Sequence, residues 1–400
     1  MSRKNTLLMY SHDGFGLGHI RRNINIATEA VQQIDLAVLM LMSHNSIPFL
    51  PNLAGIDFIK LPSILKTGKD CWTPRTLPMP PQQFKELRID LIQKTIEHFQ
   101  PSIFLVDYLP GGVWGELLPI LPALKKRGTK LILGLRDILD DPDETCKAWK
   151  KEGLYSVIEQ FYDHILIYGS RDVFPSHIVY GLQKFENKIF YTGYLASADI
   201  VRSREQIRKE FGFDERPLVV ITAGGGSDAY PMMRKSLKAL EKIAKKTEVQ
   251  ALFVAGPLMN AMQREALESD LATLPFRIIP HSDDLLSAMK AADLLLTMGS
   301  YNTIIEAIRL GIGAIVIPRE GPSQEQKIRA DLFGKLGLVS PLPSPAKLSV
   351  DRLANEIEKL LKNPFTPRLG LNFNGRNEAV HYIKLLLENE THTAHCALHT

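Results

Sequence analysis

Four hundred residues are too many for one ordinary single-core domain and predict two domains. Hydrophobic residues make up 45% and charged residues 23%, as in soluble globular proteins, and no apolar run approaches the roughly 18–20 residues that span a bilayer. The net charge of +4 suits anionic ligands or an anionic membrane surface but is too small to indicate nucleic acid. The start lacks the plan of a signal peptide, and the cysteines lie far apart, so we expect a cytoplasmic protein without disulfides.

Strand-like and helix-like stretches alternate along nearly the whole chain. Apolar runs typical of strands buried on both faces lie at 6–11, 36–42, 58–61, 103–107, 130–135 and 164–168, and again at 218–222, 250–255, 277–280, 294–297 and 314–317. Amphipathic segments between them include 82–99, 231–246, 302–310 and 324–336. This alternation predicts an α/β fold with parallel sheets covered by helices on both faces.

The alternation occurs twice, which predicts two Rossmann-like domains. A connector over 200–211 leads to a fresh strand, so we place the first domain at 1–197 and the second at 198–375. A C-terminal helix and a disordered tail are expected over 376–400. Residues 45–81 mix prolines with basic and apolar residues, which predicts either a plain surface loop or an acceptor-binding or membrane-facing lip.

Open parallel sheets bind ligands beyond the carboxyl ends of their strands, and a glycine-rich loop follows the first strand. In HDGFGLGHIRR (12–22), Gly16 and Gly18 allow a tight turn before a helix whose positive end faces the ligand. His19 at the head of that helix is a candidate general base, or else a structural or capping histidine. The spacing G-x-G-x-G and the absence of an acidic residue after the second strand argue against a nicotinamide or flavin site.

Two carboxylates are placed to orient His19. Asp107 ends the strand IFLVD, and Asp137 follows the strand LILGL at an equivalent position. Either carboxylate could hold the imidazole in one tautomer, as in other base–orienter pairs. Asp107 could instead cap the next helix, and the sequence leaves this choice open.

The second half carries two loops suited to a diphosphate. After its first strand, TAGGGSD (222–228) exposes successive backbone N–H groups, and the candidate ligands there are Gly225, Gly226 and Ser227. A later buried strand runs into TMGSYNTIIEA (297–307), where a helix begins within a few residues. Its candidate phosphate ligands are Gly299, Ser300, Asn302 and Thr303.

Side chains for a ribose and a sugar follow the second of these loops. Glu306 lies about one helical turn further on, where its carboxylate could accept both ribose hydroxyls, or where it could be a solvated helix residue. After one more strand, the polar stretch 318–329 offers Gln324, Glu325 and Gln326 to sugar hydroxyls.

These loops, in this order, resemble those of the two-domain GT-B glycosyltransferases. The resemblance extends from residue 1 to about 365 and includes the bacterial N-acetylglucosaminyltransferase that completes the lipid-linked cell-wall precursor. Shared phrases with predicted bacterial glycosyltransferases are SHDGFGLGHIRRN, LGLRDILDDP, MGSYNTIIEA and EQKIRA. The resemblance implies a fold of two Rossmann-like domains facing each other across a cleft, with an acceptor domain first and a nucleotide-sugar donor domain second.

The resemblance also implies an activity. Sugar transfer from a nucleotide-diphosphate sugar, taken as a UDP-sugar, would be inverting and independent of metal or other cofactors, with His19 deprotonating the acceptor hydroxyl. The acceptor would be a small molecule, a glycan or a lipid-linked molecule, with peripheral contact at the inner face of the membrane and no nucleic acid. Glu325 between the glutamines, and the distinct residues 45–81, depart from the cell-wall enzyme, so cell-wall synthesis itself is not implied.

Two other functions use the same scaffold. A nucleotide-sugar 2-epimerase or hydrolase would need extra carboxylates around the sugar, for which Asp107, Asp137 and Glu325 are candidates. A non-catalytic nucleotide-sugar binding protein would bind tightly without turnover.

Overall fold

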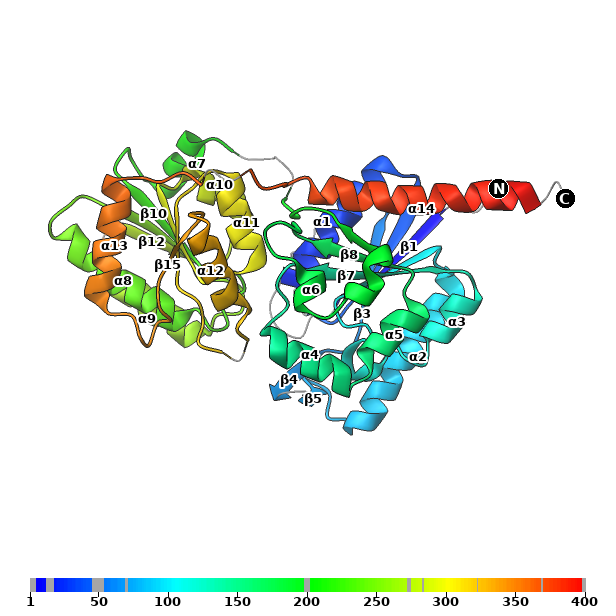
Figure 1. Ribbon diagram of the computed structural model, residues 1–400. Coiled ribbons are helices and arrows are strands. Elements are labelled where there is room, and N and C mark those ends of the chain that lie inside the picture. The colour runs from blue at the N-terminus through cyan, green and yellow to red at the C-terminus, as the bar shows by residue number, and fades with distance from the viewer. Residues whose placement is uncertain are drawn as a thin grey trace. The chain divides into compact units, whose positions relative to one another are not determined.

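The structure is a computed structural model that describes residues 5–11, 18–44, 54–68, 71–197, 202–271, 275–282, 284–321, 323–367 and 370–397. The chain divides into two compact units, Met1–Leu195 with Leu371–Thr400 (unit 1) and Ala196–Gly370 (unit 2). The boundary expected near residue 197 lies beside this division. Helix α14 (Gly375–Ala397) belongs to unit 1 and carries helical backbone into the stretch expected to be a disordered tail (Figure 1).

Unit 1 contains a seven-stranded sheet in the order β3-β2-β1-β6-β7-β8-β9, and all of its strand pairs are parallel. The strands are β1 (Asn5–Ser11), β2 (Leu36–Met42), β3 (Ile56–Lys60), β6 (Ile103–Asp107), β7 (Lys130–Arg136), β8 (His164–Tyr168) and β9 (Ile189–Tyr191). A separate antiparallel hairpin, β4 (Ile64–Gly68) and β5 (Cys71–Pro74), lies within the stretch expected to be an irregular loop or lip.

Helices cover this sheet and bury its apolar strands. They are α1 (Gly18–Gln33), α2 (Pro81–Phe99), α3 (Leu121–Lys126), α4 (Pro142–Lys151), α5 (Leu154–Phe161) and α6 (Ser176–Val179), with short 3₁₀ turns at Val113–Gly115 and Gln183–Lys188. Strand β6 is buried at all five positions, which explains its uninterrupted apolar run. Helix α14 packs on α1, where Arg376 Nε lies 2.6 Å from Glu29 Oε2.

Unit 2 repeats this architecture with six parallel strands in the order β12-β11-β10-β13-β14-β15. The strands are β10 (Leu218–Thr222), β11 (Gln250–Val254), β12 (Phe276–Ile279), β13 (Leu294–Thr297), β14 (Ala314–Val316) and β15 (Ser340–Pro341). The helices are α7 (Arg204–Phe211), α8 (Tyr230–Ala244), α9 (Ala261–Leu271), α10 (Leu285–Ala291), α11 (Tyr301–Arg309), α12 (Glu325–Lys335) and α13 (Val350–Lys362).

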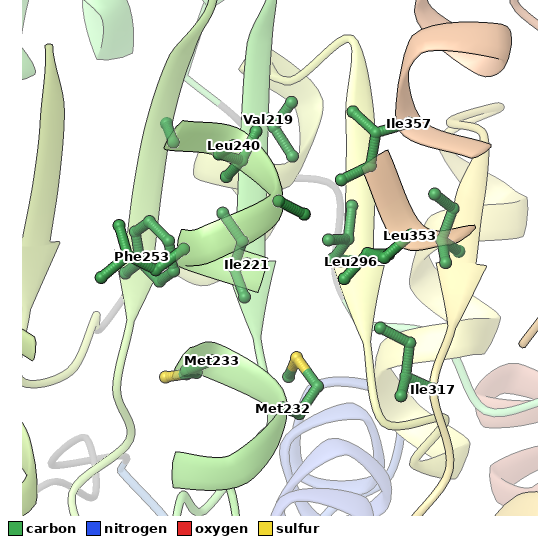
Figure 2. Packing of buried hydrophobic residues seen from close by; sticks show 14 of the residues in the cluster. Val219, Ile221, Met232, Met233, Leu240, Phe253, Leu296, Ile317, Leu353 and Ile357 are labelled. Carbon is green, nitrogen blue, oxygen red and sulfur yellow. The ribbon is translucent and has the colours of Figure 1, made fainter. Parts of the chain in front are cut away.

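The core of unit 2 forms where α8 and α13, which contact each other, pack on the sheet. Figure 2 shows Leu240 of α8 and Leu353 of α13 beside strand residues such as Leu296. These side chains are at most 1% exposed. Burial on this scale contributes about 1.5–3 kcal/mol per large apolar side chain, so packing of α8 and α13 stabilises the sheet.

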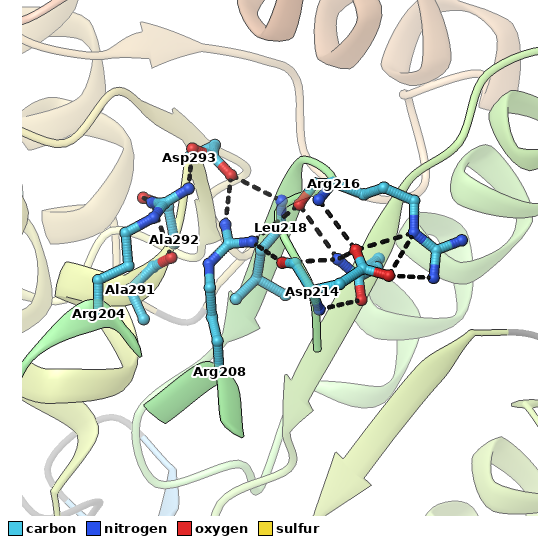
Figure 3. A network of polar contacts seen from close by, with 9 residues as sticks. Arg204, Arg208, Asp214, Arg216, Leu218, Ala291, Ala292 and Asp293 are labelled. Carbon is cyan, nitrogen blue, oxygen red and sulfur yellow. Dashed lines mark hydrogen bonds and ion pairs between the residues drawn. The ribbon is translucent and has the colours of Figure 1, made fainter. Parts of the chain in front are cut away.

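A polar network closes the other end of the unit 2 strands. Asp293, directly before β13, accepts from Arg204 Nη2 at 2.7 Å and Arg208 Nη2 at 2.8 Å, both from α7 (Figure 3). Asp293 also accepts from the backbone N–H of Leu218 at the start of β10, at 2.8 Å. The network therefore ties α7 to the amino ends of two central strands and leaves their carboxyl ends to the loops described below.

Among the described residues, no helix is both long enough and apolar enough to cross a membrane.

Candidate functional site

The carboxyl edge of the unit 1 sheet brings His19 against Asp107. His19 lies in the first turn of α1, and its Nδ1 is 3.0 Å from Oδ2 of Asp107, the last residue of β6. Strand β6 pairs directly with β1, which precedes α1 in the chain, and this pairing accounts for the meeting of residues 88 positions apart. The His19 side chain is 12% exposed and the Asp107 side chain is fully buried.

Arg22 also bonds to this carboxylate, and its role is not predicted from the sequence. Its Nη2 donates to Asp107 Oδ1 at 2.8 Å and to Oδ2 at 2.7 Å, and the Arg22 side chain is only 1% exposed. Because Arg22 follows His19 by three residues on a helix, both face the same carboxylate. That spacing was the available signal in HIRRN.

Burial and the neighbouring charges together set the protonation states of Asp107 and His19. The pKa of Asp107 is held well below its ordinary value because the neighbouring Arg22 and His19 outweigh the effect of burial. Asp107 is therefore ionised near neutral pH. Burial lowers the pKa of His19, with further lowering by Arg22 and Arg136, and Asp107 only partly offsets this. The imidazole is consequently neutral at pH 7 and can accept a proton.

One tautomer of His19 suits a base. Nδ1 lies 2.9 Å from Arg22 Nη2 as well as 3.0 Å from Asp107, so it can accept from the former or donate to the latter. Arg22 already donates to both oxygens of Asp107. Donation from Nδ1–H to Asp107 leaves Nε2 as the proton acceptor, the arrangement found in base–orienter pairs.

An aromatic ring and a second arginine border the imidazole. Tyr108 stacks on His19 with ring centroids 5.3 Å apart and an interplanar angle of 14°. The Arg136 guanidinium carbon lies over the same Tyr108 ring, 5.6 Å from its centroid. Arg136 ends β7, next to β6 in the sheet, so unit 1 places a second cation near His19.

The remaining residues expected in this loop are placed differently. Asp137, the other candidate orienter, is fully buried, and its Oδ1 accepts from the backbone N–H of Ile138 at 2.7 Å. Asp107, and not Asp137, is therefore the carboxylate bonded to His19. Gly18 begins α1 in an exposed position, and Gly16 lies outside the described residues.

In unit 2, the glycine turn after β10 is shaped by close backbone contact. Gly226 has φ of +90°, and a Cβ there would lie 2.2 Å from the Ala255 carbonyl oxygen. The Gly225 carbonyl accepts from Leu258 N–H at 2.8 Å, so this turn is locked to the loop after β11. Ser227 is exposed at the end of the turn.

The turn after β13 lies beside the glycine turn. Gly299 has φ of +90°, and a Cβ on Gly224 would be 3.9 Å from Ser300 Oγ. Ser300 occupies the N-cap position of α11, but its hydroxyl bonds to Thr303 Oγ1 at 2.8 Å and caps no backbone amide. Asn302 is half-buried in the first turn of α11. The first N–H groups of a helix lack intrahelical acceptors, so this edge can receive an anion.

Glu306 is nearly buried, at 7% exposed, and both of its carboxylate oxygens have partners. Oε1 accepts from the backbone N–H of Ser197 at 2.5 Å, and Oε2 accepts from Arg309 Nε at 3.0 Å. A solvated helix residue is therefore the wrong description. A ribose hydroxyl would have to use the acceptor positions that Ser197 and Arg309 leave on this carboxylate.

The two glutamines occupy different environments. Gln324 is half-buried at the start of α12, whereas Gln326 is 5% exposed and its Oε1 accepts from the backbone N–H of Arg319 at 3.1 Å. Gln326 thus shapes the loop after β14, and its amide oxygen is occupied. Arg319 in turn bonds to Asp228, with Nη1 3.2 Å from Oδ2, which ties this loop to the glycine turn.

Gly226→Ala is expected to destabilise unit 2 more than Gly212→Ala does. Both glycines have positive φ, which costs alanine about 1–2 kcal/mol, but a Cβ at Gly212 meets nothing within 4 Å. The clash with Ala255 adds about 1–3 kcal/mol at Gly226. Urea unfolding of both variants measures the difference. Equal losses in the free energy of unfolding would contradict the close contact between Gly226 and the Ala255 carbonyl.

Comparison with known proteins identifies relatives of unit 2 and of the whole fold. Residues 218–370 match the family model described as glycosyltransferase family 28 C-terminal domain. The UDP-N-acetylglucosamine--N-acetylmuramyl-(pentapeptide) pyrophosphoryl-undecaprenol N-acetylglucosamine transferase of Bacillus pumilus is 27% identical over 183 residues, 44% of this chain and 48% of that protein. The chain thus spans about half the length of the curated relatives it matches.

Two solved structures show the fold over the whole chain. MurG of Acinetobacter baumannii has a TM-score of 0.59 at 13% identity and covers 96% of this chain and 99% of its own. The UDP-GlcNAc 2-epimerase of Methanocaldococcus jannaschii has a TM-score of 0.61 at 14% identity, covering 96% and 100%. The expected α/β fold of GT-B type is confirmed, as is the resemblance to GT-B glycosyltransferases. Structural similarity at this level of sequence identity establishes the fold, and the activity has to be inferred from the residues of the site.

Proposed function

We propose that this chain is a glycosyltransferase that moves a sugar from a nucleotide-diphosphate sugar, in the first instance a UDP-sugar, to a hydroxyl acceptor. The observation that carries the proposal is the meeting of two turns in unit 2, Gly224–Ser227 and Gly299–Thr303, at one sheet edge. This edge lies within the part of the chain that matches the glycosyltransferase family model.

The proposed reaction divides its roles between the units. Unit 2 binds the nucleotide diphosphate, with backbone N–H groups of the two turns stabilising charge on the leaving phosphate. In unit 1, Nε2 of His19 takes the proton of the acceptor hydroxyl, and Asp107 stabilises the resulting imidazolium. The acceptor oxygen bonds to the anomeric carbon as the bond to the nucleotide diphosphate breaks, with inversion and without a metal ion.

Binding of nucleotide diphosphates tests this proposal directly. Thermal-shift and calorimetric titrations with UDP, GDP and dTDP should show one preferred nucleotide. At a ligand concentration 100 times Kd, binding adds about 2.7 kcal/mol of stability. Absence of binding by all three would remove the basis of the proposal.

A nucleotide-sugar 2-epimerase or hydrolase is the alternative, and the likeness to a UDP-GlcNAc 2-epimerase favours it at the level of fold. The candidate carboxylates for it each have a partner: Arg22 donates to Asp107, the backbone N–H of Ile138 donates to Asp137, and Arg329 donates to Glu325. Product analysis separates the two reactions, because an epimerase or hydrolase changes the nucleotide sugar without an acceptor. A binding protein would show affinity without any product.

We further propose that unit 1 meets an anionic membrane surface or a lipid-linked acceptor at the base of the β4–β5 hairpin. Lys60 Nζ donates to Ser63 Oγ at 2.9 Å and to the Leu61 carbonyl at 3.3 Å, and Arg75 is exposed on the other side of the hairpin. Within the described chain, neither cation forms an ion pair. Leu65 and Leu77 are exposed nearby in sequence, at 37% and 43%. Such a basic and apolar surface suits peripheral contact with the inner face of the membrane.

Lys60→Ala with Arg75→Ala should weaken binding to vesicles containing anionic lipid about tenfold or more at physiological salt, since each surface cation contributes about 1 kcal/mol. The matched control is Lys94→Ala with Lys147→Ala, which removes two cations that already pair with Glu97 and Glu144. Co-sedimentation with vesicles measures both. If both double variants weaken vesicle binding equally, binding depends on the net charge of the protein, and the proposed contact at the β4–β5 hairpin is wrong.

A further inference from the structure

Arg329 is a buried cation in unit 2 that no step of the proposed reaction uses. It lies in α12, its side chain is fully buried, and its Nη1 donates to Oε1 of Glu325, one turn earlier, at 2.7 Å. A buried guanidinium needs such a counter-charge, because burial of an unpaired charge is strongly unfavourable. The ion pair therefore accounts for the presence of a charge here, but not for the direction in which the guanidinium reaches.

The same nitrogen also reaches the turn after β13. Arg329 Nη1 lies 3.3 Å from the carbonyl oxygen of Gly299, and the guanidinium carbon lies 5.5 Å from the ring centroid of Tyr301, the first residue of α11. Arg329 thus links the helix that begins with Glu325 to the turn that begins α11.

The hydrogen bond from Arg329 to the Gly299 carbonyl also fixes the direction of the Ser300 N–H, on the opposite side of the turn. The carbonyl of Gly299 and the N–H of Ser300 belong to one planar trans peptide, so they point in opposite directions. A donor that holds the carbonyl therefore directs the Ser300 N–H away from Arg329. Gly299, whose φ is +90°, restricts the rotation of this peptide less than another residue would, because a glycine without Cβ has the widest range of backbone dihedral angles.

We propose that Arg329 is a positioning residue for the donor diphosphate, acting through the Gly299–Ser300 peptide. This inference rests on the proposed function, in which the turn binds the diphosphate. Arg329 needs no contact with the nucleotide: it holds the peptide whose N–H the phosphate receives. The planar guanidinium can serve both Glu325 and Gly299, which a lysine ammonium on a flexible stem does less well.

The double variant Arg329→Met with Glu325→Gln tests this role without leaving a buried charge unpaired. We expect it to fold, and to bind UDP about 10- to 100-fold more weakly than the wild type, as expected for loss of one hydrogen bond to a charged group. Affinity for uridine, which lacks the diphosphate, should change less than threefold. The matched control on the same helix is Lys327→Met with Asp331→Asn, which removes an exposed ion pair and should leave both affinities unchanged.

Each outcome of these titrations decides between the two proposals. If wild-type protein binds neither UDP nor another nucleotide diphosphate, the proposed function fails. If wild type binds UDP and the Arg329 double variant binds it equally well, or loses UDP and uridine affinity in parallel, Arg329 is structural and the positioning role is wrong. Should the double variant not fold, Arg329→Lys is measured instead: it keeps the charge beside Glu325, and a UDP affinity equal to wild type would overturn the inference.

Discussion

His19→Ala is expected to lower kcat about 10²- to 10⁴-fold, the usual contribution of a positioned general base. UDP affinity should stay unchanged, because His19 belongs to unit 1 and the proposed nucleotide site belongs to unit 2. Steady-state kinetics with the preferred donor and acceptor, together with UDP titration, measure the two quantities separately.

The pH dependence of the wild-type reaction follows from the same residue. A base must be neutral to act, and burial lowers the pKa of His19 below its ordinary value of about 6.5. The plot of kcat/KM against pH should therefore be flat from pH 7 to 8 and fall only below about pH 6.5. A fall that begins above pH 7 would contradict a neutral, buried imidazole.

His177→Ala is the matched control for His19→Ala. His177 is also a nearly buried histidine of unit 1 with a lowered pKa, and its Nδ1 lies 2.8 Å from Tyr191 Oη. It has no carboxylate partner equivalent to Asp107 among the contacts described. If both variants lose activity equally, the effect reports damage to unit 1 and the assignment of His19 as base is wrong.

Asp107→Asn should impair both stability and turnover. It leaves Arg22, which is 1% exposed, without its negative partner, and breaking a buried ion pair in this way costs about 3–5 kcal/mol. The amide can also donate a hydrogen bond toward His19 Nδ1, which favours the wrong tautomer and fails to stabilise the imidazolium. We expect kcat to fall by at least about 10²-fold in the fraction that remains folded.

The stability that Asp107 contributes has a defined pH window. Its pKa in the folded protein is depressed below the unfolded value of about 3.9, so the contribution is complete above that pH and is lost as the pH falls further. The free energy of unfolding, measured in urea at pH 7 and at pH 3, should therefore fall by less between these pH values in Asp107→Asn than in wild type.

Glu116→Gln separates the two effects of Asp107→Asn. Glu116 and Arg88 form another fully buried ion pair of unit 1, with two contacts of 2.7 Å. Loss of this ion pair should lower the free energy of unfolding about as much as Asp107→Asn does. The pH profile of kcat/KM should stay unchanged. An identical change in that profile would show that Asp107 acts only through stability.

The strands that the sequence predicted and those it missed differ in length and burial. Every predicted strand is present, because runs such as Ile103–Asp107 and Leu218–Thr222 are buried at every position and leave a continuous apolar signal. The edge strands β9 and β15 are three and two residues long. Strands of this length are too short to show a periodic pattern of apolar residues. The β4–β5 hairpin was also missed, since its strands alternate weakly and proline ends the second.

The sequence by itself determined the two-unit α/β plan, the glycine turns at the strand ends and the position of His19 at a helix start, because these depend on residues close together in the chain. Only the tertiary structure decided that Asp107 bonds to His19 and Asp137 does not, that Arg22 shares this carboxylate, and that Gln326 and Arg329 turn inward. Parallel pairing brings the carboxyl ends of neighbouring strands together, but the direction of each side chain depends on packing between segments far apart in sequence. Local pattern therefore predicts where a site forms, and long-range packing selects the groups that meet in it.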